Sequence, residues 1–595
     1  MFVITSTAND DPAAARQVKP AALPPCRSRR MAGILAHAPH TSVHAVTSRF
    51  REAVVAVLLA AGVALAFHWL LYPRVADPDS FYHVGHARLY AATSIFYTSF
   101  PWTAFSAIAT QKADLWWGFH VLLLPFAAFH DPAEAIRVAA VVVTVTSLLL
   151  VAWLAFRHRF LSAFLWPLVF FLAVPNVLFR YMAVRPGELS VPLALLLLSA
   201  LVRRQPLLTV GVATAVTWVH LSMFWLGPGI VVTWALAVLI DRRLLGDDTP
   251  ERPPSRWRTL PGLAVAVGAG TILGWLLRPN PLGAARLAWI QIAKLLFEKS
   301  GGVPLTFAVE LAPLKPHDVW NMAWPLFVPW CLALGALLWA ALRHREALRA
   351  MPPEERAHLW TTLLLAAGFL GLTGFVARRS LVQWAAFAVV SLALTVTWLT
   401  PARRAAWASR ILLLAIPLFF AYSLWRNALN DTFVAQPADT LEEVADWLAA
   451  HSRPGDLVFN THWDTFGPLF ARDRVDHYVG GMDPIFQYAR SPALYWEFHH
   501  LSTDEDARVT CPDPVCTGDD ARDTYAVLTR DFGARWVLVQ PRRNPRLSEY
   551  LLHDPRYRLT LETPGAAVFE VLGDSVPPSA APTTPGDEGP GSRGS

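Results

Sequence analysis

The stretch "EAVVAVLLAAGVALAFHWLLYPRVADPDSFYHVGHARLY" (Glu52–Tyr90) joins a long apolar run to a segment rich in charged and aromatic residues. The run over residues 53–72 has the length of about 20 residues that an α-helix needs to cross the hydrocarbon core of a membrane. Two aspartates, Asp77 and Asp79, follow it where the chain would reach water. Acidic side chains are costly in a bilayer and often functional at its edge. The stretch therefore predicts a membrane protein with a candidate site after its first span.

The composition points to the same class of protein. The chain has 595 residues, of which 54% are hydrophobic and 16% are charged. Further apolar runs lie at about 136–156, 160–179, 188–202, 206–219, 223–240, 259–277, 321–342, 359–376, 380–399 and 411–427. Together with the first run they predict an α-helical polytopic membrane protein with about 11 transmembrane helices. The net charge of +6 comes from short basic clusters between the runs, so we expect no nucleic-acid partner.

The basic clusters predict how the chain is oriented. They fall at every second loop, at Arg49/Arg51, Arg157/Arg159, Arg203/Arg204, Arg242–Arg258, Arg343–Arg356 and Arg403–Arg410. Because cytoplasmic loops carry an excess of Lys and Arg, all six clusters are expected inside. The expected location is the cytoplasmic (inner) membrane, with the N-terminus inside and the C-terminal domain outside, in the periplasm.

One apolar segment does not fit as a span. If "DLWWGFHVLLLPFAAFHD" (Asp114–Asp131) crossed the membrane, "RHR" at 157–159 would lie outside, against the charge rule. We therefore expect a short helix that dips into the outer leaflet. Residues 73–135 then form a long first external loop. Residues 278–318 form another long external segment, which could gate the site or be a plain surface loop.

Four regions follow from this assignment. Residues 1–48 have no continuous apolar stretch typical of a signal peptide and are expected to form a disordered cytoplasmic N-terminus. Residues 49–430 form the transmembrane domain. Residues 431–574 are expected to form an external soluble α/β domain, and residues 575–595, rich in Pro, Gly and Ser, a disordered tail.

The predicted α/β domain has recognisable elements. An amphipathic helix is expected in "DTLEEVADWLAAHS", strands in "DLVFN" and "ARWVLVQ", and a hairpin in "YRLTLETPGAAVFEV". Cys511 and Cys516, in "CPDPVC", are close enough in sequence for a local bridge, which suits an oxidising compartment. The same spacing also occurs in half of a zinc site, but no second Cys/His pair at ligand spacing is evident nearby.

The external acids are the candidate chemistry. Asp77 and Asp79 follow the first span, and Glu188, in "FRYMAVRPGELS", follows the third. Carboxylates that converge from separate helices are the ligands that Mg²⁺ or Mn²⁺ prefers, often together with a substrate phosphate. Arg185, in the same motif, would supply donors to phosphate oxygens. As an alternative, each of the three acids could cap a turn or helix.

Other polar residues allow two interpretations each. His83 and His86 could bind a metal, but their i, i+3 spacing beside aromatic residues is more typical of interfacial contacts. Arg378 and Arg379, in "GFVARRSLVQW", are an adjacent pair left outside against the charge trend. They are expected to bind either the phosphate of a specific anionic substrate or lipid headgroups. Within the spans, His220 is the main ionisable residue.

The motif "DSFYHVGHAR" after a first span, followed by a long external loop, resembles the GT-C membrane glycosyltransferases. It looks most like the catalytic subunit of oligosaccharyltransferase. The resemblance implies that Asp79 is the essential aspartate of the first external loop. It also implies that "VRPGELS", with Glu188, is the second acidic motif, which in that family usually has two acids.

The resemblance extends into the C-terminal domain. There the family has a helix, a strand and then a Trp-Trp-Asp-Tyr-Gly motif that binds the acceptor. In this chain "HWDTFG" stands at that place, with His462 for the first Trp and one extra residue before the Gly. Acceptor binding by Trp463 and Asp464 is thus implied, while a Trp core anchor with an Asp turn is the structural alternative.

The resemblance implies a function. GT-C enzymes use polyprenyl-phosphate or polyprenyl-diphosphate sugars, so the expected partners are such a donor, membrane lipids and an acceptor whose identity the sequence does not give. Asp79 and Glu188 would be catalytic, and Asp77, Asp79 and Glu188 would hold Mg²⁺ or Mn²⁺. Arg185, Arg378 and Arg379 would bind the donor phosphate. Competing classes are a transporter or flippase, which predicts paired charges at the bilayer midplane, and a non-catalytic scaffold with an external sensor domain.

Overall fold

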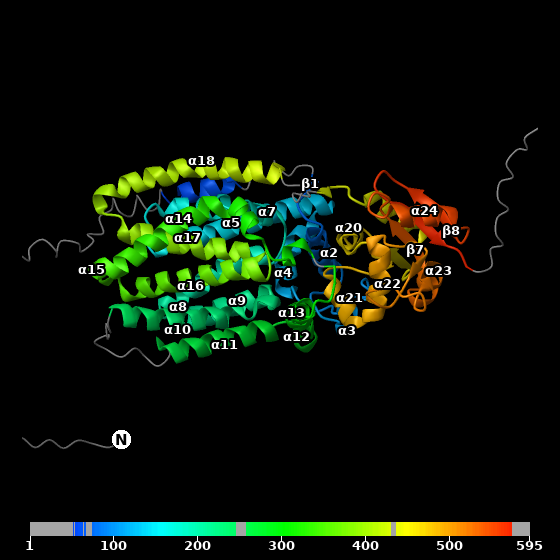
Figure 1. Cartoon of the computed structure of the whole chain (residues 1–595), viewed down its shortest axis with the longest axis horizontal. Helices are drawn as coiled ribbons and strands as arrows, with labels where there is room; N and C mark the ends of the chain where they lie inside the picture. The colour runs from blue at the N-terminus through cyan, green and yellow to red at the C-terminus, as the bar shows by residue number, and fades with distance from the viewer. Residues whose placement is uncertain are drawn as a thin grey trace, which may run out of the picture. The chain divides into compact units, whose positions relative to one another are not determined.

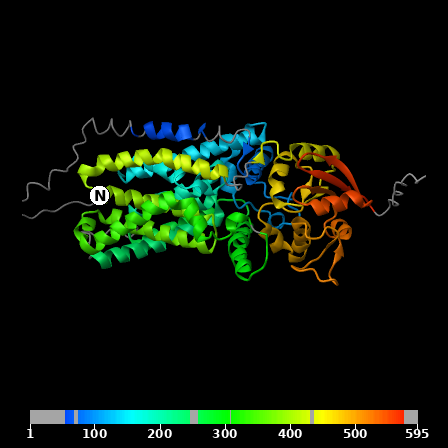
Figure 2. The same cartoon turned by 45° about the horizontal axis from the view of Figure 1, so that its top comes forward.

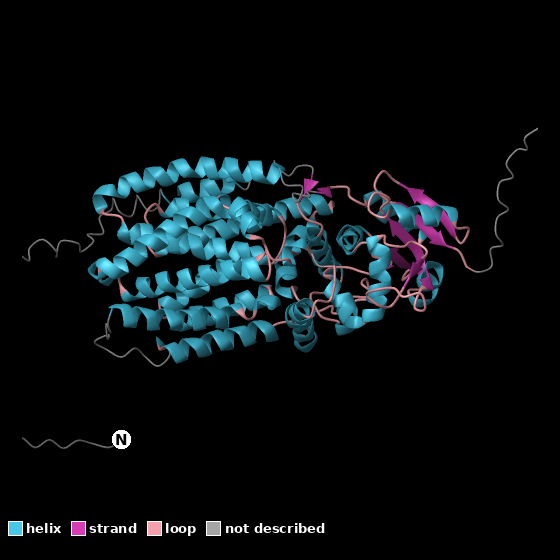
Figure 3. Ribbon diagram, in the orientation of Figure 1, coloured by secondary structure: helices cyan, strands magenta, loops and turns pink. Residues whose placement is uncertain are grey.

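The computed structural model describes residues 74–245, 258–306, 308–429 and 436–573, together with residue 52 and residues 54–63 and 65–66. Long apolar helices dominate the part before residue 430, and a mixed sheet lies in the part after residue 436 (Figure 3). The predicted segments 1–48 and 575–595 lie outside the described residues.

Six described helical segments are long and apolar enough to cross a membrane by themselves. They are Pro132–Arg157 (α5), Leu221–Leu245 (η3 and α10), Pro316–Arg343 (α14), Pro353–Phe375 (α16), Ser380–Leu399 (α17) and Ala402–Asn427, which spans η7 (Ala402–Arg404) and most of α18 (Ala405–Leu429). The count rises to at most eight if two bent pairs are each one span. The chain is therefore a multi-pass membrane protein.

The bent pairs and three short helices complete the apolar part. One pair is Ala163–Leu172 (η2 and α6) with α7 (Pro175–Met182), bent by 87°, and the other is α11 (Leu260–Leu276) with Pro281–Ser300 (α12, η5 and α13), bent by 110°. The shorter apolar helices are Val54–Val63, α8 (Gly187–Val202) and α9 (Pro206–Val219). All eleven predicted apolar runs fall on these helices as far as they are described. Three of them are short, so the count of about 11 spans stays a prediction.

The apolar helices pack closely against one another. α9 lies against α8 and α11, and α16 lies against α10 and α17, as Figures 1 and 2 show from two sides. Trp166, Trp384 and Tyr181 are fully buried in the core that these helices share. Many outward apolar side chains, such as Leu332 and Leu414, are instead exposed, as expected for a surface that faces lipid.

Residues 74–131 form short elements and no span. They contain β1 (Arg74–Val75), α2 (Asp79–Ala92), α3 (Ala107–Gln111), α4 (Trp117–Leu122) and η1 (Leu124–Ala128). The predicted short helix in Asp114–Asp131 is present as α4 and η1, which both pack against α2. The later segment between α11 and α14 contains α12 (Pro281–Trp289), η5 (Ile290–Lys294), α13 (Leu295–Ser300) and η6 (Val309–Leu311).

The C-terminal region is an α/β domain, as predicted. Its five-stranded sheet has the order β4 (His477–Tyr478), β3 (Leu457–Asn460), β7 (Ala534–Val539), β9 (Ala567–Val571) and β8 (Tyr557–Glu562). β3 is parallel to β4 and β7, whereas β9 is antiparallel to both β7 and β8. The helices are α19 (Glu442–His451), η8 (Trp463–Thr465), α20 (Phe466–Arg472), α21 (Pro484–Arg490), α22 (Pro492–Thr503), α23 (Thr524–Ala526), η9 (Val527–Asp531) and α24 (Pro545–His553). A separate ribbon joins β5 (Val509–Thr510) to β6 (Arg522–Asp523).

This domain contacts the segment that follows the first apolar run. β1 pairs with β2 (Gln436–Pro437), and α2 packs against α20. The contact between α2 and α20 is close: a Cβ on Gly467 would come within 2.4 Å of the Pro78 carbonyl oxygen. Only glycine fits there, so the C-terminal domain is seated directly on the turn that carries Asp77 and Asp79.

Candidate functional site

Asp77 and Asp79 are both held by Arg185. The Nη2 atom of Arg185 lies 2.6 Å from Oδ1 of Asp77 and 2.9 Å from Oδ2 of Asp79, and its Nε donates to the other oxygen of Asp77. Asp77 is buried just before α2, and Asp79 is the first residue of that helix. α2 begins without a side-chain cap, so Asp79 does not have the capping role considered as an alternative.

The second acidic motif lies beside the first through two arginines. Glu188, in the first turn of α8, is buried, and its Oε1 lies 3.6 Å from Nε of Arg180. Its other oxygen is buried without a hydrogen-bond partner among the described residues. Arg180 also pairs with Glu310 of η6, and Nη1 of Arg185 lies 3.1 Å from the same carboxylate. Glu310 therefore bridges the two arginines.

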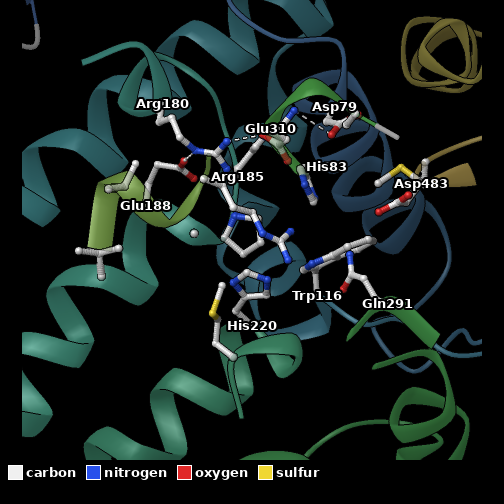
Figure 4. Close-up of a pocket in the computed structure, with 18 of the residues that line it drawn as sticks. Asp79, His83, Trp116, Arg180, Arg185, Glu188, His220, Gln291, Glu310 and Asp483 are labelled. Atoms are coloured by element: carbon white, nitrogen blue, oxygen red, sulfur yellow. Dashed lines mark hydrogen bonds and ion pairs between the residues drawn. The ribbon is translucent and has the colours of Figure 1, made fainter. Parts of the chain in front are cut away.

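All of these side chains except Asp77 line one charged cavity, shown in Figure 4. Its walls come mainly from α2, α7, α8, η5, η6, the start of α17 and the C-terminal domain. The polar side chains that line it are Asp79, His83, Arg180, Arg185, Glu188, His220, Gln291, Glu310, Arg379, Gln383 and Asp483. Carboxylates and guanidinium groups from segments far apart in sequence thus meet in one cavity.

Burial shifts the pKa values of the acids outside the apolar helices in different directions. For Asp79, burial raises the pKa to about 7, although Arg185 opposes the shift. For Asp483, burial raises the pKa to about 6, although Arg379 opposes it. For Glu310, burial acts in the same direction, but Arg180, Arg185 and Arg379 outweigh it and lower the pKa well below its ordinary value. Asp79 can therefore gain or lose a proton near neutral pH, while Glu310 stays ionised.

A second cavity, mainly apolar, adjoins the charged one. The two share His220, Met223, Gln291, Arg379 and Gln383. Leucine, phenylalanine and tryptophan side chains of η5, α13 and α16 and their neighbours line the rest of it, among them Trp225, Leu295, Leu296, Phe369 and Leu372. Two cations lie in its lining, Arg379 and Lys299. An amphiphile with an anionic group could lie across both cavities.

The structure separates the predicted phosphate and acceptor residues. Arg379 lines both cavities, whereas its neighbour Arg378 lines neither. Trp463 lines the charged cavity. Asp464 lies outside that lining and forms an ion pair with Arg543 at 3.0 Å. Their roles in binding stay predictions, and geometry favours Arg379 and Trp463 over Arg378 and Asp464.

Two acids of the site had little or no sequence signal. Glu310 lies in the predicted external segment 278–318 but stands in no motif of its own, and Asp483 has no motif either. Asp483 lies in "GGMDP", a turn that brings it from the C-terminal domain to the cavity. Its Oδ1 is buried without a partner among the described residues. Only a Gly-Gly and Asp-Pro turn marks this place in the sequence, and such turns are common.

The carboxylates do not form a ready metal site. Asp77 already accepts two hydrogen bonds from Arg185, and Asp79 and Glu188 each face an arginine. Three trios of described residues place ligand atoms within 4.8 Å of one another, and none includes these three acids. A cation there would have to displace a guanidinium group. Binding of Mg²⁺ or Mn²⁺ stays a prediction.

His83 and His86 lie inside the protein, not in an interfacial belt. They are 3% and 4% exposed and pack among Tyr82, Trp116 and Phe100. Their neighbours include His120, a residue of the segment that was expected to dip into the outer leaflet. Side chains from three segments of the chain therefore converge on one buried aromatic cluster.

The two cysteines of "CPDPVC" lie next to each other far from the cavity. Their sulfur atoms are 2.12 Å apart, and the geometry is that of a disulfide. His500, which stands in no motif with these cysteines, has Nε2 at 3.3 Å from the sulfur of Cys511. The predicted bridge in an oxidising compartment stays a prediction for the protein in solution.

Comparisons with known proteins identify the fold. No family model and no curated protein sequence matches the chain. The crystal structure of ArnT from Cupriavidus metallidurans bound to undecaprenyl phosphate matches with a TM-score of 0.50 and 12% identity, over 88% of this chain and 99% of that one. The apo structure of the same protein matches with a TM-score of 0.48 and 12% identity, over 86% and 97%. The likeness to the first structure gives this chain the GT-C fold predicted from its sequence.

Proposed function

We propose that this multi-pass membrane chain is a GT-C glycosyltransferase that moves a sugar from a polyprenyl-phosphate donor to an acceptor at the external face of the membrane. The observation that carries the proposal is the pair of joined cavities. A charged cavity with Asp79 in its wall shares five residues with an apolar cavity, and Arg379 lines both. A lipid-linked sugar has the same division into apolar tail, anionic link and polar head.

Each part of the donor has a suitable place. The polyprenyl chain would lie in the apolar cavity, against Leu295, Phe369 and Leu372. The phosphate would lie near Arg379, with Lys299 in the same wall, because guanidinium and ammonium groups stabilise phosphate oxygens. The sugar would then extend into the charged cavity. ArnT, whose fold this chain shares, was crystallised with undecaprenyl phosphate, which supports a donor of this class.

Sugar transfer breaks the bond between the anomeric carbon and the phosphate oxygen and forms a bond to the acceptor oxygen. Positive charge develops on the sugar ring in the transition state, and negative charge develops on the leaving phosphate. Ionised Asp79 would stabilise the positive charge on the ring and take the proton of the acceptor hydroxyl as the new bond forms, while Arg379 would stabilise the negative charge on the leaving phosphate. Arg185 holds Asp79 in place. Glu188 and Glu310 hold Arg180, and Glu310 also contacts Arg185.

The acceptor would enter from the side of the C-terminal domain. Trp463 and Asp483 of that domain line the charged cavity. An aromatic ring and a partly uncompensated carboxylate are suited to a hydroxylated or amide-bearing acceptor. The external position of this domain and the oligosaccharyltransferase-like use of Trp463 are parts of the same proposal. The protein would then lie in the inner membrane, with residues 431–574 in the periplasm.

The decisive experiment replaces Asp79 by an isosteric neutral residue. Purified wild-type protein in detergent or vesicles should transfer sugar from lipid-linked donors extracted from the source cells, as detected by mass spectrometry of donor and product. Asp79→Asn should reduce transfer by at least about 10³-fold, because the charge at the reacting centre is lost while the shape is kept.

The matched control is Asp318→Asn, an exposed acid in the first turn of α14 that lies outside both cavities. It should transfer as the wild type does. If Asp79→Asn inserts and folds normally and still transfers at the wild-type rate, the enzyme assignment is wrong.

A further inference from the structure

A chain of buried hydrogen bonds leads from Asp114 to the charged cavity. Nδ1 of His120 lies 2.6 Å from Oδ2 of Asp114, and Nε2 of His120 lies 2.8 Å from Nδ1 of His83. His83 is one helical turn after Asp79 on α2, and both line the cavity. His83 and His120 are 3% and 0% exposed, so solvent does not compete for these bonds.

The far end of this chain is a carboxylate that can only accept. Oδ1 of Asp114 accepts the backbone N–H of Trp116 at 2.8 Å, and Oδ2 accepts the hydroxyl of Tyr90 at 2.8 Å. Burial raises the pKa of Asp114, but the neighbouring His120 and His86 and the hydrogen bonds from His120 and from the Trp116 backbone outweigh it and hold the pKa below its ordinary value. Asp114 is therefore ionised, and Nδ1 of His120 must carry the proton that they share.

The direction of the first bond fixes the others. When His120 carries a single proton, held on Nδ1 by Asp114, its Nε2 has a lone pair that accepts a hydrogen bond from Nδ1 of His83. Burial keeps the pKa of His83 well below its ordinary value, which leaves the His83 ring neutral. Nε2 of His83 then carries no proton, and it has no hydrogen-bond partner among the described residues. Figure 4 shows this ring at the wall of the cavity.

The same group of residues is poorly arranged to hold a metal. His86, Asp114 and His120 bring ligand atoms within 4.8 Å of one another. However, the rings of His86 and His120 are stacked, with centroids 4.3 Å apart and planes 14° apart. Lone pairs in nearly parallel ring planes do not point at one ion, and both nitrogens of His120 already have partners.

We infer that Asp114 and His120 fix the tautomer of His83, so that Nε2 of His83 accepts a hydrogen bond from a hydroxyl group of the sugar or acceptor in the cavity. The inference rests on the proposed function. A phosphate or carboxylate offers no proton to this lone pair, so the His83 side of the cavity selects a hydroxyl group. The anionic part of the donor is left to Arg379. His83 is a substrate-binding residue, and His120 and Asp114 are positioning residues.

The sharpest test reverses the polarity of the chain. In Asp114→Asn the amide nitrogen can donate to Nδ1 of His120, which then becomes an acceptor. Nε2 of His120 would donate to Nδ1 of His83, and Nε2 of His83 would carry a proton and point a donor at the substrate. Transfer should fall by about 10- to 100-fold, because a substrate hydroxyl loses its acceptor in a buried site.

Two further variants separate polarity from packing. His120→Leu removes both bonds and should lose activity as Asp114→Asn does. His120→Gln should restore most of it relative to His120→Leu, because the amide can donate to Asp114 and accept from His83. Tyr90→Phe is the matched control at the other side of Asp114: it removes a neutral hydrogen bond to the same oxygen without reversing the chain. Its loss of transfer should stay below about 3-fold.

Nitrogen-15 NMR of histidine-labelled protein in membranes reads the tautomer directly. The signals of His83 are assigned by their loss in His83→Gln. Wild-type Nε2 should have the shift of an unprotonated ring nitrogen at neutral pH, and in Asp114→Asn it should move to that of a protonated one.

The inference is overturned if wild-type Nε2 of His83 is protonated, or if Asp114→Asn reverses the tautomer and transfers sugar like the wild type. If Asp114→Asn does not fold, the wild-type spectrum and the two His120 variants decide, and equal activity of those two variants would overturn it. Absence of transfer by the wild-type protein would instead contradict the proposed function.

Discussion

Arg185 organises the acidic residues of the cavity. Its guanidinium group contacts Asp77 and Asp79 at the start of α2 and Glu310 of η6, which come from two separate segments. A single cation cannot fully compensate three carboxylates in a buried site, so the carboxylate with the weakest pairing is the easiest to protonate. That acid is Asp79, whose pKa burial raises to about 7. Asp77 is held on both oxygens, and its place beside Asp79 suggests that it orients Arg185.

The neighbours Arg378 and Arg379 allow a clean test of donor binding. Arg379 lines both cavities, whereas Arg378 lines neither. Arg379→Ala should raise the KM for the lipid-linked donor by about 10- to 100-fold, because a charge-assisted contact to phosphate is lost from a partly enclosed site. The measurement is the donor dependence of transfer in vesicles of constant lipid composition.

Arg378→Ala is the control and removes the same charge one residue away. Its KM for the donor should change by less than about 3-fold. Equal effects of the two substitutions would contradict a specific phosphate site and favour general binding of lipid headgroups.

At the scale of single residues, local sequence could identify only part of the site. Asp79, Glu188 and Arg185 stand in short motifs at the ends of apolar runs, and Arg379 stood out because it opposes the charge trend of the loops. Asp483 could not be found in this way, because it reaches the cavity only through the packing of the C-terminal domain on α2. The pairing of His83 with His120 depends in the same way on a contact across 37 residues.

Among the elements, η6 is the one that ties a long loop to the site. Glu310 of η6 pairs with Arg180 and Arg185, and the backbone N–H of Arg379 donates to the Glu310 carbonyl at 3.1 Å. The segment 278–318, for which gating was one of two interpretations, is thus held at the cavity by ion pairs and by a backbone hydrogen bond. Release of these contacts would open the cavity on this side.

Glu310→Gln should loosen this attachment. Two arginines would then lose their shared carboxylate, and the excess positive charge should draw Asp79 closer to Arg185 and make it less available to substrate. We expect kcat/KM to fall at least about 10-fold and limited proteolysis within residues 301–306 to become faster.

Glu298→Gln is the matched control in the same segment, because Glu298 pairs with Lys294 at 2.8 Å and lies outside both cavities. It should have little effect on either measurement. Faster proteolysis of Glu310→Gln with unchanged transfer would show that η6 anchors the loop without serving the reaction.

The elements themselves were the most predictable level of structure. All eleven apolar runs are helical as far as they are described, because about 20 apolar residues in lipid have few alternatives to a helix. The strands and the hairpin of the C-terminal domain also lie where alternation and turn residues placed them. Sequence could not reveal that α6 and α7 are bent by 87°, since that bend depends on packing around Pro175 as well as on the proline itself.

For the whole molecule, the side of the membrane that holds the cavity depends on the number of spans between the basic clusters. At the C-terminal end the structure offers three candidate spans. α16, α17 and α18 lie between Arg343 and Asp431, and each contains a segment long and apolar enough to cross by itself. An odd number of crossings places these two positions on opposite sides.

Reporter fusions test this orientation directly. A reporter after Arg343 should be cytoplasmic, because Arg343–Arg356 is one of the six basic clusters, and a reporter after Asp431 should be external. The control is a third reporter after Arg403, before α18, which should again be cytoplasmic. A fusion after Arg410 is avoided because it would interrupt α18.

An external reporter after Arg343 together with a cytoplasmic reporter after Asp431 would place Asp79 and the C-terminal domain inside the cell. The enzyme would then use donors at the cytoplasmic face, and a disulfide between Cys511 and Cys516 would no longer be expected. The same compartment for both positions would mean that one of the three helices does not cross the membrane.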